Sequence, residues 1–168
     1  MPDRLPAIAI EEFTPADTDG VIDLILPIQR EEFGVAVSAA DQPDLRNVRN
    51  FYQSGTGGFW VAKSAGRIVG TIGLRDMGGG QAALRKMFVA AEFRGRGHGV
   101  AAALLDRLLS HAAGKGIGAI YLGTTDKFVA AHRFYEKHGF TEVDKSALPP
   151  SFPLMAVDTK FYVRKLSG

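Results

Sequence analysis

The chain has 168 residues, of which 46% are hydrophobic and 23% charged, as in ordinary globular domains. This composition excludes disordered and collagen-like proteins, and no apolar run approaches the roughly 20 residues that span a bilayer. The formal net charge of +2 is too small to indicate nucleic-acid binding, and the absence of cysteine excludes disulfides, thiolate metal sites and a cysteine nucleophile. We therefore expect one cytoplasmic domain over residues 1–168 that binds neither membrane nor nucleic acid.

The N-terminal part of the chain predicts a strand followed by two helices. Residues 7–13 alternate weakly between apolar and polar side chains, which favours a strand. Asp17 or Thr18 is a good cap for the first helix, and Pro27 is expected to kink or end it. A second helix is expected to begin after Asp41, because a proline in its first turn is well tolerated.

The middle of the chain predicts three strands and a long helix. Two runs rich in β-branched and aromatic residues, 58–63 and 67–76, flank a Ser-Ala-Gly turn and predict a hairpin. A further strand is expected over residues 81–89, after a glycine-rich turn. From residue 97 to 113 the apolar side chains recur with the period of an amphipathic helix.

The C-terminal part returns to alternating elements. We expect a short strand over residues 119–122, a helix over 128–138 and strands over 140–143 and 154–166, the last two separated by a proline-rich loop. The resulting order is β-α-α-β-β-β-α-β-α-β-β. This order predicts a mixed α/β fold with antiparallel hairpins before a central β-α-β unit.

Glycine is over-represented, with 20 residues where average usage gives about 12, and one cluster lies in Arg94–Gly99 just before the long helix. Unpaired amides at a helix N-terminus bind phosphates, and glycines let the backbone approach a ligand closely. The dinucleotide pattern G-x-G-x-x-G/A formally fits residues 97–102. However, seven residues separate this stretch from its strand, and no acidic residue ends a strand about 20 residues on. A P-loop is excluded because its pattern is absent.

Two motifs resemble those of the GNAT-type N-acetyltransferases. The family signature Q/R-x-x-G-x-G/A follows a strand that ends in valine, and here Val89 leads into Arg94–Gly99. Downstream, residues 131–140 match the family pattern A-x-x-L/F-Y-x-x-x-G-F, with Tyr135 as the tyrosine. The resemblance covers roughly residues 7–163. It implies a single-domain α/β (α+β) fold whose central, mixed, mostly antiparallel twisted sheet is flanked by helices on both faces.

The resemblance also implies acetyl-CoA as cofactor and transfer of its acetyl group directly to a primary amine of a small molecule, a peptide or a protein N-terminus. In such enzymes the strand before the signature loop contacts the pantetheine arm, and the loop amides surround the pyrophosphate. By motif position the implied cofactor-binding residues are Met87, Phe88, Val89, Arg94, Gly95, Arg96, Gly97, His98, Gly99 and Val100.

The transfer chemistry requires a stabilised oxyanion, a proton for the departing thiolate and a neutral amine. A backbone N–H of Phe88 or Val89 is the natural oxyanion donor. Tyr135 is a candidate general acid, because a phenol keeps its proton until the thiolate develops. The base stays open among Glu31, Glu32 and Asp126, since the relevant strand carries Arg-Lys where relatives often have a carboxylate.

Several features leave alternatives open. Relatives often have asparagine at the position of Phe128, which cannot make the same hydrogen bond, so a non-catalytic acyl-CoA sensor of the same fold remains an alternative. The four histidines form no metal-binding pattern. Glu32 and Phe33 are expected at the acceptor wall. A homodimer through the long last strand is also expected to be feasible.

Overall fold

The computed structural model describes residues 7–32, 34, 38, 40, 42–95, 99–126, 129–155 and 158–166. Within these ranges the strands form a seven-stranded sheet in the order β1-β2-β3-β4-β5-β7-β6. The elements in chain order are β1 (Ala9–Glu12), α1 (Thr18–Pro27), α2 (Val48–Phe51), β2 (Gly58–Ser64), β3 (Arg67–Gly78), β4 (Gln81–Val89), α3 (Val100–Gly114), β5 (Ala119–Thr124), α4 (Val129–Lys137), β6 (Thr141–Val143) and β7 (Lys160–Lys165).

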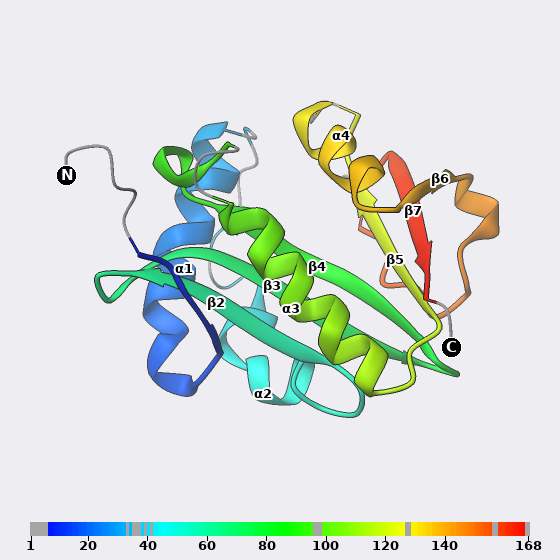
Figure 1. Cartoon of the computed structure of the whole chain (residues 1–168), viewed down its shortest axis with the longest axis horizontal. Helices are drawn as coiled ribbons and strands as arrows, with labels where there is room; N and C mark the ends of the chain where they lie inside the picture. The colour runs from blue at the N-terminus through cyan, green and yellow to red at the C-terminus, as the bar shows by residue number, and fades with distance from the viewer. Residues whose placement is uncertain are drawn as a thin grey trace.

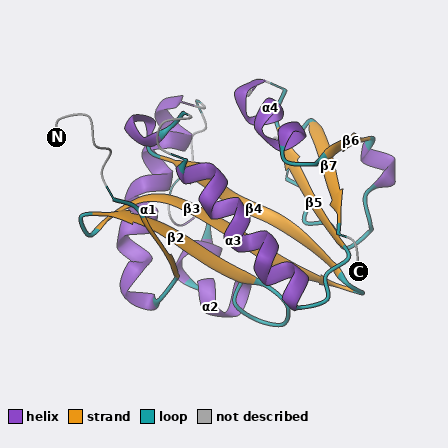
Figure 2. Ribbon diagram, in the orientation of Figure 1, coloured by secondary structure: helices purple, strands orange, loops and turns teal. Residues whose placement is uncertain are grey.

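Helices cover both faces of this sheet. In Figures 1 and 2, α3 lies in front of β2, β3 and β4, while α1 and α2 lie behind them. The glycine at position 70 of β3 allows α3 to pack closely, because a Cβ there would lie 2.9 Å from Leu104 and 3.1 Å from Val100. On the opposite face the ring of Phe59 packs 5.3 Å from that of Tyr52, at the end of α2. The two faces therefore have separate helical layers.

Every ladder in the sheet is antiparallel except one. β4 and β5 are parallel, and they are joined by α3. A parallel pair needs a crossover of this kind, and here the crossover helix buries Leu104, Leu105 and Leu108 completely. The expected fold class, a mixed and mostly antiparallel sheet with helices on both faces, is confirmed.

Some expected boundaries are wrong for local reasons. In place of one helix after residue 41 there is a 3-10 turn over Pro43–Arg46 and a single α-helical turn, α2. The first helix does end at Pro27, but the chain continues as a π-helix over Ile28–Glu32. The final strand begins at Lys160 rather than residue 154, because the N–H of Asp158 bonds the carbonyl of Met155 in a turn. Asp41, Phe33 and Phe128 lie outside the described residues.

The position of β7 bears on the expected dimer. β7 lies between β5 and β6 and pairs with both, so its backbone edges are used within the chain. The edge strands of the described sheet are β1 and β6. Within the described sheet the last strand therefore offers no open edge, and the expected dimer through this strand stays a prediction. Among the described helices, none combines the length and apolar character needed to cross a bilayer.

Candidate functional site

The central feature of the site is the separation of β4 from β5. The two strands pair at only three positions, from Gln81 with Ala119 to Ala83 with Tyr121. Beyond Ala83 the ladder stops, although β4 continues to Val89, and Figure 1 shows the two ribbons diverging toward the N-terminal end of α3. Over residues 84–89, β4 pairs with β3 but not with β5. Its β5-facing backbone edge is thus left without a strand partner.

A β-bulge in β4 accompanies this separation. Thr71 pairs with Phe88 and Gly73 pairs with Arg85, so two residues of β4 between these pairs oppose one residue of β3. Lys86 within the bulge has a φ of 55°, in the left-handed region, and its carbonyl accepts a 2.7 Å hydrogen bond from the buried hydroxyl of Thr71. Bulges change the direction of the following ladder groups. The bulge therefore sets the orientation of Met87, Phe88 and Val89, the residues expected to contact the pantetheine arm.

The signature loop leads from β4 to the first turn of α3. Gly95 and Gly99 have φ angles of 100° and 63°, and a Cβ at either position would meet nothing within 4 Å. Glycine is therefore needed at these two positions for its backbone conformation, since residues with a side chain avoid positive φ. The first helical hydrogen bond of α3 runs from Ala103 to the carbonyl of Gly99, which leaves the amides of the preceding turn, including Val100, without intrahelical partners. Arg96, Gly97 and His98 lie outside the described residues.

Arg94 and Glu32, expected in the cofactor and acceptor sites respectively, bind each other. The guanidinium donates to both carboxylate oxygens, at 2.5 and 2.9 Å, and the Arg94 Nε donates to the carbonyl of Val89 at 2.8 Å. Arg94 therefore ties the signature loop to the segment after α1 and to the end of β4. The pair is about 40% exposed on each side, so it contributes only about 0–1 kcal/mol to stability.

Tyr135 lies on α4 beside β7 and is 8% exposed. Its ring packs against Phe134, Phe140 and Tyr162, at centroid distances of 5.7 to 6.0 Å. Burial raises the pKa of the phenol to about 12. Among the described residues its hydroxyl has no hydrogen-bond partner, so the protonated hydroxyl is available as a donor. The assignment of Tyr135 as general acid stays a prediction.

A buried polar network on the α2 face was not predicted from the sequence. The hydroxyl of Tyr52 donates a 2.5 Å hydrogen bond to Asp44, and the Lys86 ammonium lies 3.6 Å from the same carboxylate. Lys86 also donates to Gln42 at 2.5 Å, and Gln42 exchanges two hydrogen bonds with Gln29. Burial lowers the pKa of Lys86, and Asp44 opposes this shift. No sequence pattern marks these residues, because only the fold brings the turn at 42–44 onto β4.

A second unpredicted group lies at the divergence of β4 and β5. Arg85, on β4, places its Nη2 3.4 Å from the sulfur of Met155. The backbone N–H of Met155 in turn donates to the Asp158 carboxylate at 3.2 Å. That carboxylate lies against β5, because a Cβ at Gly123 would be 2.6 Å from its Oδ2. Burial raises the pKa of Asp158, while the positive charge of Arg85 lowers it by a smaller amount.

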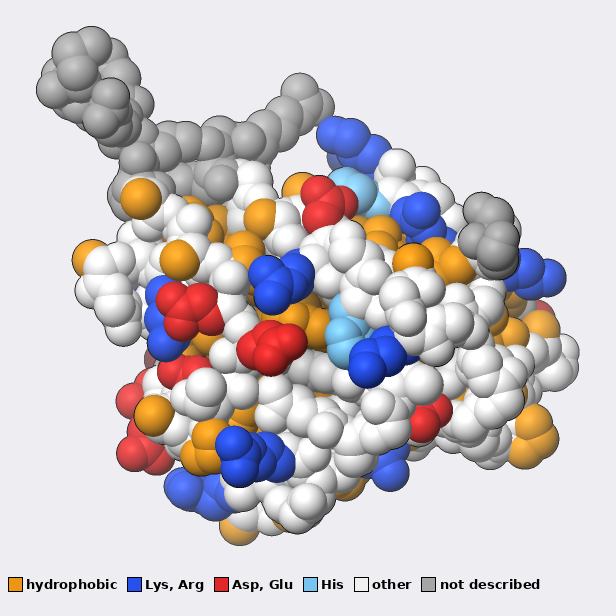
Figure 3. Space-filling view, turned by 60° about the horizontal axis from the view of Figure 1, so that its bottom comes forward, with side chains coloured by type: hydrophobic (Ala, Val, Ile, Leu, Met, Phe, Trp, Pro, Cys, Tyr) orange, Lys and Arg blue, Asp and Glu red, His pale blue; other side chains and the backbone are white. Residues whose placement is uncertain are grey.

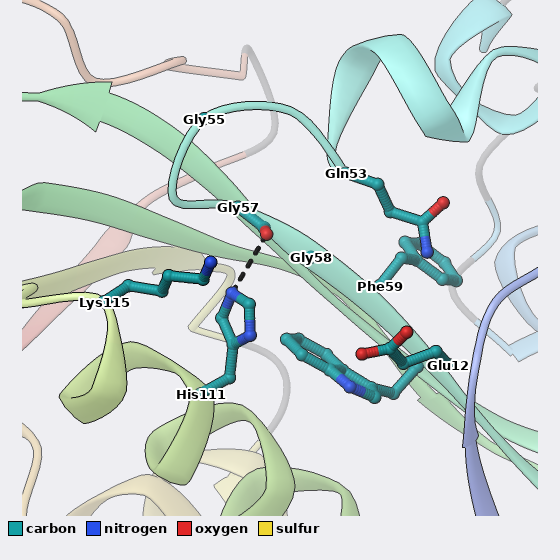
Figure 4. A pocket seen from close by; sticks show the side chains of 9 residues that line it. Glu12, Gln53, Gly55, Gly57, Gly58, Phe59, His111 and Lys115 are labelled. Carbon is teal, nitrogen blue, oxygen red and sulfur yellow. Dashed lines mark hydrogen bonds between the residues drawn. The ribbon is translucent and has the colours of Figure 1, made fainter.

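A pocket of about 210 Å³ lies elsewhere, at the opposite end of α3 (Figure 4). His111, in the last turn of α3, and Lys115, the residue after this helix, face the glycine-rich turn before β2 across this pocket. The His111 Nε2 lies 3.0 Å from two backbone carbonyls, those of Thr56 and Gly57, so this nitrogen carries the proton. On the face seen in Figure 3, basic and acidic side chains are interspersed. The pocket belongs to neither the signature loop nor the β4–β5 divergence.

Comparison with known proteins identifies the family of this chain. A family model described as the acetyltransferase (GNAT) family matches residues 22–140. An acetyltransferase of the GNAT family from Staphylococcus aureus Mu50 is 40% identical, with a TM-score of 0.90 over 96% of this chain and 100% of that one. An acetyltransferase from Streptococcus agalactiae 2603 is 28% identical, with a TM-score of 0.89 over 95% and 98%. The chain belongs to the GNAT acetyltransferase family.

Among curated relatives, N-acetylaspartate synthetase from Danio rerio is 35% identical over 105 residues. That match covers 61% of this chain but only 36% of the relative. The chain therefore spans a little over a third of the length of this relative.

Proposed function

We propose that this protein is an acetyl-CoA-dependent N-acetyltransferase that transfers an acetyl group directly to a primary amine. The observation that carries the proposal is the divergence of β4 from β5 at the N-terminus of α3, next to a loop with glycines at positive φ. Membership of the GNAT family supports the same activity. The acceptor amine belongs to a small molecule, a peptide or a protein N-terminus.

The residues at this divergence fit coenzyme A. Its pantetheine arm carries amide groups that need hydrogen-bond partners, and the β5-facing edge of residues 84–89 has no strand partner. Its phosphates need donors, which the first-turn amides of α3 supply. The space around Gly95 and Gly99 leaves room for the ligand to approach the backbone. When bound, acetyl-CoA supplies an acetyl group already activated as a thioester.

The chain itself contributes orientation and two kinds of donor. The backbone of Met87–Val89 provides N–H groups for the oxygen that gains negative charge during transfer, so no side chain is needed for this role. The hydroxyl of Tyr135, kept protonated by burial, is the proton donor for the leaving group. Glu31, Glu32 and Asp126 stay candidates for the base, although the Glu32 carboxylate is already bound by Arg94.

The test measures thiol release and coenzyme binding together. The protein is incubated with acetyl-CoA and a panel of primary amines, free thiol is followed with a colorimetric reagent, and the acetylated product is identified by mass spectrometry. Coenzyme affinity is measured by calorimetry. We expect thiol release that depends on the amine. Tight binding of coenzyme A without thiol release for any amine would refute the enzyme and favour a sensor of the same fold.

A pair of alanine variants tests the cofactor loop. In Gly99→Ala the backbone at φ 63° becomes strained by about 1–2 kcal/mol, so we expect coenzyme affinity to fall about tenfold. Gly114→Ala is the matched control, because position 114 ends the same helix without positive φ and has open space around it. Equal affinities for the two variants would contradict the placement of the phosphates at this loop.

A further inference from the structure

We propose that the acceptor is a free amino acid, with its carboxylate bound by Arg85 and its ammonium group bound by Asp158. This inference rests on the proposed function and names the substrate class of the same site. It follows from two opposite charges that the fold places on either side of Met155, each without an ion-pair partner among the described residues.

Arg85 is placed to bind an anion at the divergence of the two strands. It lies two residues beyond Ala83, the last residue of β4 that pairs with β5, and it is partly exposed. Its guanidinium contacts the sulfur of Met155, a weak hydrogen-bond acceptor, and most of its five donors have no partner in the described part of the chain. A carboxylate matches the fork of a guanidinium in a bidentate geometry. Arg85 thus has both the position and the free donors to bind one.

The neighbouring charges increase the preference for an anion. Lys86 is compensated by Asp44, whose carboxylate also accepts the hydrogen bond of Tyr52, so Asp44 is not available to Arg85. On β3, the guanidinium of Arg75 stacks 3.8 Å above the ring of Phe51, and its buried Nη1 has no hydrogen-bond partner among the residues that the structure describes. This part of the α2 face therefore has more positive than negative charge, which an acceptor carboxylate offsets.

Asp158 supplies the complementary negative charge. Its Oδ2 accepts a hydrogen bond from the Met155 N–H, and the carboxylate lies against Gly123 of β5, where any side chain would collide with it. The turn that carries Asp158 is joined to the end of β5, because the N–H of Thr159 bonds the carbonyl of Thr124 at 2.8 Å. Asp158 is thus held beside the divergence from the β5 side, while Arg85 lies on the β4 side. A zwitterion complements this pair of charges.

Arg85 does not belong to the phosphate-binding end of the site. Its partner in β3 is Gly73, whose Cβ position points at Phe59 on the α2 face. Burial raises the pKa of Tyr52 on that face, and the positive charge of Arg85 opposes this rise. The N-terminal turn of α3, by contrast, packs on the opposite face through Val100. The two anion-binding features therefore lie on different faces of the sheet, consistent with one for the donor and one for the acceptor.

The first arm of the test compares free L-amino acids with their own carboxamides and with putrescine, a diamine without a carboxylate, using thiol release with acetyl-CoA. We expect kcat/KM to be at least tenfold higher for one or more free amino acids than for the matching carboxamides. This arm uses the wild-type protein, so it does not depend on the folding of any variant. Turnover of carboxamides or putrescine at the rate of the best free amino acid would overturn the inference.

The second arm uses Arg85→Gln and Asp158→Asn. We expect each variant to raise the KM for the preferred amino acid at least tenfold and to leave the affinity for coenzyme A unchanged. Arg107→Gln and Asp106→Asn, at exposed positions on α3, are matched controls. Arg85→Lys should recover part of the loss. An unchanged KM in Arg85→Gln overturns the inference about the acceptor but not the proposed acetyltransferase activity. The absence of thiol release with any amine overturns both proposals.

Discussion

Removal of a single hydroxyl, in Tyr135→Phe, tests the assignment of the general acid. Burial raises the pKa of Tyr135 from 10.0 to about 12, which disfavours the ionised form by roughly 3 kcal/mol. The hydroxyl therefore keeps its proton up to about pH 11. General acid catalysis contributes about 10²–10⁴-fold, so we expect kcat to fall by that factor while the affinity for coenzyme A is retained.

The stability of this variant provides the control. The ring contacts with Phe134, Phe140 and Tyr162 are all kept by phenylalanine, and the hydroxyl has no partner among the described residues. We therefore expect the free energy of unfolding at pH 7 to change by less than about 1 kcal/mol. Because the folded-state pKa is raised, the wild-type protein binds more protons folded than unfolded above pH 10. Its stability then falls as pH rises from 10 toward 12, and the variant lacks this loss.

The assay is steady-state thiol release at saturating acetyl-CoA and amine, with urea unfolding of both proteins at pH 7 and pH 11. A Tyr135→Phe protein that folds normally and retains full kcat would refute the general-acid assignment. Tyr135 would then be an aromatic residue of the hydrophobic core, which its buried ring contacts alone would explain.

Two further predictions concern charged pairs. Asp44→Asn leaves the Lys86 ammonium buried without its carboxylate, so we expect a loss of about 3–5 kcal/mol and a midpoint at least 6 °C lower in thermal unfolding. Burial lowers the folded-state pKa of Lys86, so stability should rise with pH toward 10.5, more steeply in this variant. Glu32→Gln releases Arg94 from its ion pair and should tighten coenzyme binding several-fold, whereas Arg94→Gln should weaken it. If calorimetry shows that both variants weaken coenzyme binding equally, the ion pair only positions the loop.

Local patterns in the sequence predicted most of the fold because each element has its own periodic signal. The strand over residues 81–89 and the helix after the signature loop are found where expected, the latter beginning at Val100. The prediction of secondary structure failed in segments where the apolar residues have no regular spacing. The chain from Pro43 to Phe51 contains two short helical pieces because tertiary packing buries Leu45 and Val48 there without a continuous helix.

The donor side of the site could be predicted from the sequence because its parts are contiguous. A strand, a glycine-rich turn and a helix start follow one another within residues 81–100, so backbone geometry alone creates a phosphate-binding end. The acceptor side could not be predicted in this way. Arg85 and Asp158 are 73 positions apart, and neither lies in a recognisable pattern. They approach Met155 only because β7 pairs with β5 while β4 diverges from it, an arrangement set by packing and ladder pairing across the whole sheet.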